Sequence, residues 1–266
     1  MDRTRPQARG VRHRALLLIV ALCTCGTPNE STTVFTPAIH EIEYEYRWDW
    51  GEASPQDDGS WRVTTDQGYA IQVLSGAITH YSVQLVPCET RESAIRIDSL
   101  FGIAKAWAGH SDIAPDPSLM TQQHIQSLVN PEAVRTVNLT VKNHTYCQVH
   151  AVLGPADADA NGLEKHGFMA NKTLVLSGRY RAPNSPDEVP FHIESDLGIG
   201  EFMDWQSEPI NMDESGVRVI LTHRLDKLLD HIQWDTQHPN EIAWFIMTNA
   251  IKNTTIEIKR GTNGQP

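Results

Sequence analysis

Histidine is the residue type in this chain best suited to site chemistry, because imidazole is the commonest metal ligand in proteins and titrates near neutral pH. The 266 residues include twelve histidines. His80 and His150 lie in stretches that alternate polar and apolar residues, and His110 lies in the glycine-containing stretch 106–112. Imidazole suits transition metals such as copper. We therefore expect His80, His110 and His150 to bind one metal ion together.

The faces of the predicted strands bear on whether these side chains can meet, because successive residues of a strand point to opposite faces. The alternation around His80 predicts that its side chain lies on the polar face of a strand, opposite Val83. The alternation around Cys147 predicts an apolar face for Cys147 and a polar face for Tyr146 and His150.

Cys88 and Cys147 are the two cysteines outside the N-terminal region. Two cysteines in an exported chain most simply form one disulfide, and a pair of unpaired buried thiols is the alternative. Cys88 is expected on the same strand face as His80, whereas Cys147 is expected on an apolar face. A bond between the two cysteines therefore requires the strand that carries Cys88 to bend or end at Pro87. Such a bond would hold the two histidine-bearing strands together. The cysteines lack the CxxC spacing that is typical of zinc sites.

A separate cation signal is the sequence Asp-Ala-Asp-Ala-Asn-Gly, which begins at Asp157. It matches the first six positions of a calcium loop, in which Asp157, Asp159 and Asn161 would supply oxygen ligands. Position twelve of an EF-hand is glutamate, but this chain has Phe168 there, which excludes a complete EF-hand. Two structures fit these residues: an acidic turn between strands, which the turn preferences of Asp, Asn and Gly favour, and a calcium site with these three ligands.

The first 25 residues have the organisation of an export signal. Five arginines precede the apolar run Ala15 to Leu22, which is too short to cross a bilayer, since a span needs about 20 residues. The following Cys-Thr-Cys resembles the end of a bacterial lipobox, with Cys25 as the lipid-carrying residue or Cys23 as the alternative. Residues 26–36 are small and polar, as in a flexible tether. We predict an envelope lipoprotein, anchored to the outer-membrane lipid bilayer and facing the periplasm or the cell surface. The alternative is ordinary secretion.

The composition limits the classes of partner. The formal net charge is −11, which disfavours nucleic acids as partners, since phosphate binding depends on lysine and arginine. An acidic surface is compatible with cations. The export signal indicates the oxidising side of a membrane, where a disulfide between the two cysteines of the body would persist.

Strand-like alternation dominates the remainder of the chain, for example in residues 40–48, and turn-forming clusters separate the alternating stretches. Helical spacing appears in residues 225–232 and again after Asn240, which could cap a second helix. We predict a single mainly β domain over residues 37–260. Its expected architecture is an antiparallel β-sandwich with one or two peripheral C-terminal helices.

Several fragments resemble known exported proteins: residues 80–88, 109–111, 146–150 and 217–234. These fragments look like parts of a group of bacterial exported lipoproteins. They are also distantly similar to the MbnP-like, or metallo-mystery pair, periplasmic copper proteins. The resemblance implies a metal bound through histidines, and Trp107 near His110 matches the tryptophan beside the metal in that family.

Two function classes follow for the β domain. The first is metal binding, with copper as the expected ion, through the three histidines. The alternative is a protein- or glycan-binding or structural module of the cell envelope that uses no metal. Trp48, Trp50 and Trp61 could then form an aromatic platform, although their strand context favours core positions. The sequence contains no GxSxG, P-loop or HExxH motif, so catalysis is not indicated.

Overall fold

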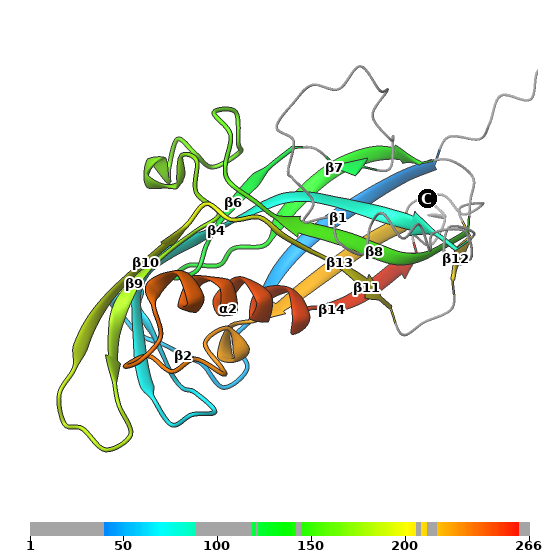
Figure 1. Ribbon diagram of the computed structural model, residues 1–266. Coiled ribbons are helices and arrows are strands. Elements are labelled where there is room, and N and C mark those ends of the chain that lie inside the picture. The colour runs from blue at the N-terminus through cyan, green and yellow to red at the C-terminus, as the bar shows by residue number, and fades with distance from the viewer. Residues whose placement is uncertain are drawn as a thin grey trace, which may run out of the picture. The chain divides into compact units, whose positions relative to one another are not determined.

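The structure is a computed structural model that describes residues 40–88, 119–120, 122–141, 145–205, 209–211 and 217–260. These residues belong to a compact unit that spans residues 37–266. Two of the predicted site residues, Cys25 and His110, lie outside the described residues. The prediction of a mainly β fold is confirmed, because the strands form a β-sandwich with a peripheral C-terminal helix, α2 (Pro239–Lys252) (Figure 1).

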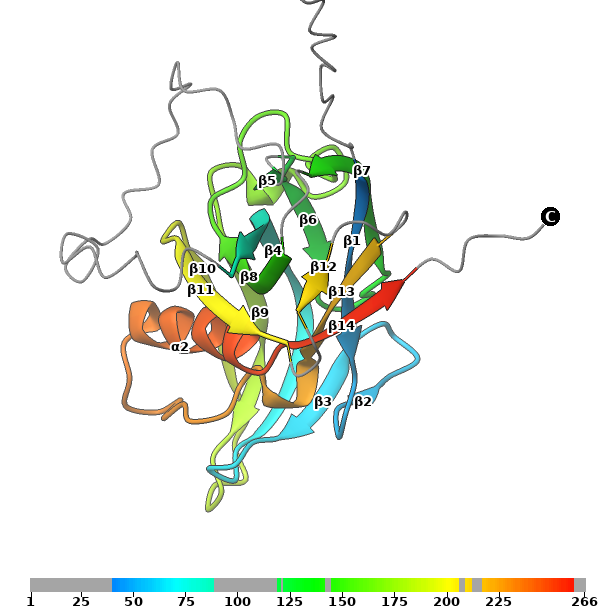
Figure 2. The ribbon, with the colours of Figure 1, turned by 90° about the vertical axis from the view of Figure 1, so that its right-hand side faces the viewer.

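The first sheet has the strand order β14, β13, β1 and β7. Their bounds are Thr255–Arg260, Val217–Arg224, His40–Asp49 and Val134–Val141 respectively. β1 runs parallel to β13, whereas the other two pairings are antiparallel. Figure 2 shows β14, β13 and β1 side by side in this layer. Ile42, Tyr44 and Tyr46 of β1 are buried, as the alternation of its sequence predicts, but Glu45 between them is fully buried as well.

The second sheet is organised around one long strand, β4 (Ala70–Pro87). Its first half pairs with β3 (Trp61–Thr64), which carries β2 (Ser54–Pro55), and with β9 (Leu174–Arg181), which carries β10 (Val189–Ser195). Its second half pairs with β6 (His124–Ser127), β5 (Leu119–Met120) and β8 (Thr145–Leu153). β8 in turn pairs with β11 (Ile199–Asp204) and β12 (Ile210–Asn211).

The two halves of β4 are covered by different layers. Over the first half, α2 packs Ile246 and Met247 into a core that includes Ile71. Over the second half, the first sheet contributes Val219 to a core that includes Val83. Each buried side chain of this size contributes about 1.5–3 kcal/mol through the hydrophobic effect. The first sheet and α2 therefore fix β4 from the same side. On the opposite face, the middle of β4 is buried at Ala77 in a third, smaller core with Met169, whereas Gln72 in the first half is only partly buried.

The helical spacing of residues 225–232 does not correspond to an α-helix. These residues form a short 3-10 turn, η3 (Leu225–Lys227), followed by irregular turns. The spaced leucines are nevertheless fully buried, because the turns pack into the core beneath α2. The second predicted helix is present as α2, but its N-cap is His238 rather than Asn240. The His238 imidazole accepts the Asn240 N–H, and the Glu241 carboxylate accepts the His238 N–H.

Candidate functional site

A hollow of about 250 Å³ opens on the second sheet. Along β3, β4 and β9, residues such as Val63, Ile71 and Leu176 enter the core that α2 covers. The alternate residues emerge on the opposite face, where they line the hollow. The lining includes the charged and amide side chains of Glu52, Arg62, Gln72, Arg179, Arg181 and Glu188. We call this feature the arginine hollow.

Strand register aligns the central residues of the arginine hollow. Arg62 of β3 lies opposite Gln72 of β4, which lies opposite Arg179 of β9. Neighbouring strands are about 4.8 Å apart, so the backbones of the two arginines are separated by roughly 10 Å with a glutamine between them. Arg181 follows on the same face of β9, opposite Ala70. The small side chain of Ala70 leaves space between the longer ones.

Among the residues that the structure describes, partners occupy only a few of the N–H donors in the arginine hollow. An Arg62 Nη2 donates to Gln72 Oε1 at 3.4 Å, and Arg179 Nη1 lies 3.6 Å from Glu188 Oε2. The Arg179 and Glu188 side chains are 56% and 52% exposed, so their ion pair is worth little, roughly 0–1 kcal/mol. Each guanidinium has five N–H donors. The hollow can therefore offer hydrogen bonds to an incoming acceptor.

A hydrogen-bonded chain begins next to the arginine hollow, at Ser177 of β9. Its Oγ lies 2.6 Å from His192 Nδ1, and His192 Nε2 lies 2.9 Å from Glu194 Oε1. The ionised carboxylate only accepts, so Nε2 carries the proton and the Ser177 hydroxyl donates to Nδ1. Lys172 donates to the other Glu194 oxygen at 2.6 Å, and this bond is the largest cause of the lowered pKa of Glu194.

This Ser177 network has the order of a serine–histidine–carboxylate triad, but its setting is different. The His192 side chain is 58% exposed, so water reaches the imidazole. The network joins β9 to β10, since Ser177 and His192 are cross-strand partners. Sequence reasoning missed both features, because each depends on strand register: the arginine hollow needs the pairing of β4 with the distant β9, and the Ser177 network needs the register of the β9–β10 hairpin.

A buried polar group, which we call the histidine cluster, lies between the two sheets. It consists of His80, His223, Tyr46, Trp48 and Gln126. His80 and His223 are each 2% exposed. The His80 ring stacks on Tyr46 with a centroid distance of 4.1 Å and lies 5.1 Å from the His223 ring. The cluster therefore connects β4, β6, β1 and β13 through the interior.

Hydrogen bonds within the cluster fix the protonated nitrogens. Gln126 Oε1 accepts from Trp48 Nε1 at 2.7 Å and from His80 Nε2 at 2.9 Å. His223 Nδ1 donates to the carbonyl of Ala250 in α2 at 3.0 Å. Burial lowers the pKa of His80 well below its usual value and that of His223 to about 4. Both imidazoles are therefore neutral at neutral pH.

The predicted position of His80 on the polar face is wrong. The register of β4 with β8 shifts between His80 and Ser82, so Tyr81 is an extra residue in the strand. Such a bulge reverses the alternation, and His80 therefore points inward together with Val83. The polar neighbours in the sequence were a misleading guide, because parity holds only while a strand is regular.

His80 and His150 are not brought together. His150 is half-buried on the face of β8 opposite the buried Val149, and its ring stacks on Phe202 of β11 at 4.3 Å. Its partner on β4 is Gln84 rather than His80. His110 lies outside the described residues. Within the described ranges, no group of three or more His, Cys, Asp and Glu side chains is arranged to hold a metal ion.

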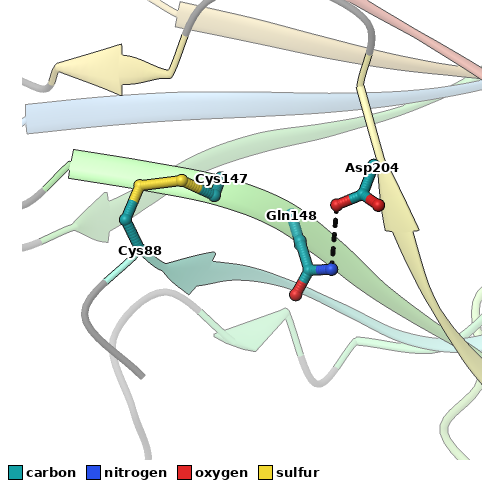
Figure 3. Close-up of a disulfide and its surroundings, with 4 residues drawn as sticks. All are labelled: Cys88, Cys147, Gln148 and Asp204. Carbon is teal, nitrogen blue, oxygen red and sulfur yellow. Dashed lines mark hydrogen bonds between the residues drawn. A yellow bond between two sulfur atoms is a disulfide. The ribbon is translucent and has the colours of Figure 1, made fainter. Parts of the chain in front are cut away.

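The disulfide between Cys88 and Cys147 is confirmed (Figure 3). The parity conflict is resolved at the end of β4, where the register shifts between Val86 and Pro87. The predicted faces near Cys147 were wrong, because Tyr146 is buried and Cys147 is only half-buried. Further along β8, Gln148 donates to an Asp204 oxygen at 2.9 Å. The disulfide therefore lies beside the core rather than within it.

The predicted calcium ligands form a turn that is braced by the segment before β6. Gln123 Nε2 donates to Asp157 Oδ2 at 2.7 Å, and the Asp157 N–H donates to Gln123 Oε1 at 2.7 Å. The Asp159 carbonyl accepts from Gln122, and the Asn161 N–H donates to the Gln123 carbonyl. These contacts are those of an acidic turn, the alternative that the sequence left open. Calcium binding stays a prediction.

The tryptophans do not form an exposed platform. Trp61 is fully buried and donates to the Leu128 carbonyl at 2.8 Å, and Trp48 is buried in the histidine cluster. Trp50 is partly buried against the core below α2. Their strand context was therefore the better guide, and they contribute apolar area rather than a sugar-binding surface.

Comparison of the chain with protein-family models, curated proteins and solved structures found no match. Within the described part of the chain, α2 and the 3-10 turns include no helix with the length and apolar character of a membrane span. The geometry of the site is therefore the basis for a functional conclusion. Its chemical content is a set of preorganised hydrogen-bond donors on an open sheet face.

Proposed function

We propose that this chain is a ligand-binding module of an extracytoplasmic compartment and that it binds its ligand in the arginine hollow. The observation that carries the proposal is the alignment of polar side chains from β3, β4 and β9 around one concave site. Binding sites are concave and carry a few well-placed polar groups, and a site held by strands is more precise than one held by loops.

The compartment is supported by two features of the chain. The signal-like first 25 residues suit export, and the Cys88–Cys147 disulfide suits an oxidising environment. We propose that the mature domain is held at the bacterial envelope by lipid on Cys25. The tether-like residues 26–36 would then separate the domain from the bilayer, so that its sheet face is accessible to a ligand.

A non-metal module fits the described residues better than the three-histidine copper site. His80 is committed to Gln126 inside the histidine cluster, and His150 faces away from it. The arginine hollow, in contrast, combines an opening with unused donors. Copper or calcium binding remains a competing proposal, and it makes a different prediction about which residues respond to added ligand.

The test is backbone amide NMR of the soluble domain, titrated separately with a panel of sugars and small acids, with copper(II) and with calcium. A ligand of the proposed kind shifts the signals of Arg62, Gln72 and Arg179 in a saturable manner. Saturable copper binding that instead perturbs His80 or His150, with no response of the hollow to the organic panel, would contradict the proposal. A calcium response at Asp157 would identify a separate cation site.

A further inference from the structure

The charges of the arginine hollow point to the chemistry of its ligand. We propose that the hollow binds an oxyanion carried by a small polar molecule, a carboxylate or a phosphate on a ligand of sugar size. This inference rests on the proposed function, since it names the ligand class of the same site. The local charge, the donor geometry and the size of the hollow all favour such a ligand.

The local charge of the hollow is opposite to that of the whole chain. Arg62, Arg179 and Arg181 line it, whereas Glu52 and Glu188 are the acidic side chains of its lining. The lining is thus net positive on a chain of net charge −11. Anions are repelled by the overall field and attracted where the guanidinium groups gather. An oxyanion is therefore the ligand group that this site favours relative to the rest of the surface.

The donor geometry suits oxygen atoms in particular. Guanidinium presents its N–H groups in a planar fork that matches the two oxygens of a carboxylate or phosphate. Arg62 and Arg179 flank the amide of Gln72 in one row across three strands. Gln72 Nε2 donates to Ser60 Oγ at 2.9 Å, which holds the amide in place. A bound oxyanion can thus receive hydrogen bonds from both sides of a fixed central residue.

The size and the acidic rim indicate a small polyhydroxylated molecule. The volume of the hollow, about 250 Å³, lies just below the range of drug-sized ligand pockets, about 300–1,000 Å³, so its ligand is small. The carboxylates of Glu52 and Glu188 cannot bind an anion, but they accept hydrogen bonds from hydroxyl groups. A sugar acid or a sugar phosphate combines both groups, because its anionic end meets arginine and its hydroxyls meet glutamate.

The experiment compares glucuronate with glucose by isothermal titration of the soluble domain, since the two share a ring and differ in one carboxylate. Glucose 6-phosphate and inorganic phosphate are the second and third probes. We expect glucuronate or glucose 6-phosphate to bind at least roughly tenfold more tightly than glucose. Glucose lacks the charge-assisted hydrogen bonds of the anionic group, which contribute about tenfold to hundredfold in affinity. Arg62→Gln and Arg179→Gln should each weaken that binding by roughly tenfold.

The matched control is Lys252→Gln, which removes one positive charge from the exposed end of α2 on the other side of the sheet. It should leave the affinity within about twofold, because a distant surface charge is screened by salt. Circular dichroism of each variant shows that the exposed substitutions leave the fold intact. A uniform loss in all three variants would mean that net charge, rather than the hollow, determines binding.

The other outcomes separate the inference from the proposed function. Equal binding of glucuronate and glucose at the hollow would overturn the oxyanion inference and leave the binding module standing. Inorganic phosphate that binds as tightly as the sugar derivatives would overturn the sugar-sized ligand while keeping the oxyanion. If no probe binds, or if arginine-dependent binding is seen only with vesicles containing phosphatidylglycerol, the inference is wrong. If, in addition, no ligand in the NMR panel shifts the signals of the hollow, the proposed function is wrong as well.

Discussion

The neutral imidazoles of the histidine cluster make the stability of the domain depend on pH. The pKa of His223 is lowered by burial from its usual value of 6.5 to about 4 in the folded state. Between these values the unfolded chain binds more protons than the folded chain, so acidification favours unfolding. The free energy of unfolding therefore has its full value above pH 6.5 and decreases as the pH falls toward 4.

We predict that the free energy of unfolding falls by about 3 kcal/mol between pH 6.5 and 4 because of His223. The lowered pKa of His80 acts in the same direction. Urea unfolding at a series of pH values measures this slope. His223→Gln should flatten it, since glutamine does not titrate. Thr254→Val is the control, because it removes a hydroxyl that contacts His223 Nδ1 at 2.6 Å while the imidazole remains. A slope unchanged in His223→Gln would show that other groups cause the acid sensitivity.

Gly178 lies where β9 passes so close to β4 that there is no room for a side chain. A Cβ there would lie 2.1 Å from the Gln72 carbonyl oxygen and 2.7 Å from the Phe191 ring. Because Gly178 pairs with Val73 and precedes Arg179, the close approach of β9 to β4 beneath the arginine hollow depends on it.

We predict that Gly178→Ala lowers the free energy of unfolding by about 1–3 kcal/mol, because the neighbouring backbone must shift. Gly167→Ala is the matched control, since a Cβ at that position has nothing within 4 Å, and its effect should stay within about 0.5 kcal/mol. Chemical unfolding of both variants provides the comparison. Equal stabilities would show that β9 can move away from β4 at little cost.

At the scale of elements, the sequence predicted strands well and their faces poorly. The apolar residues of β1 are buried as its alternation predicts, because β1 keeps to the pleat where they share a core with β4 and β8, but Glu45 on the other face is buried too. In β4, a bulge near Tyr81 reversed the faces, and nothing in the local sequence marks an extra residue. The leucines after β13 have helical spacing, yet tertiary packing holds them in turns. The arginine row was unpredictable because it needs the register of three strands.

The disulfide stabilises the pairing of β4 with β8. It closes a loop with a sequence separation of 59, for which the chain-entropy model gives about 4 kcal/mol. We predict that the Cys88→Ala, Cys147→Ala double variant keeps the strand spectrum in circular dichroism but loses about 2–4 kcal/mol of unfolding free energy. Each single variant is a control for the effect of a lone thiol. Full stability of the double variant would mean that the β4–β8 hydrogen bonds suffice.

At the scale of the whole molecule, the two layers that cover β4 have different consequences for binding. The first sheet and α2 bury one side of the second sheet in two cores that meet at the histidine cluster. The arginine hollow therefore lies on a rigid floor whose opposite surface is packed. A ligand in such a site pays little to order the protein, because the strands are already fixed. This is the property expected of a binding module.

Lipid on Cys25 is the proposed means by which the domain is held at the envelope. If Cys25 carries lipid, the full-length chain expressed in a Gram-negative bacterium should incorporate radiolabelled palmitate. It should also fractionate with membranes, because more than one acyl chain on the protein anchors it stably. Cys25→Ser should abolish the label and release the domain in soluble form, whereas Cys23→Ser should retain both the label and the membrane fraction. The reverse pattern would assign the lipid to Cys23. If the unaltered chain is exported without the label, the lipid anchor is wrong and ordinary secretion is the explanation. The domain would then bind its ligand while diffusing freely.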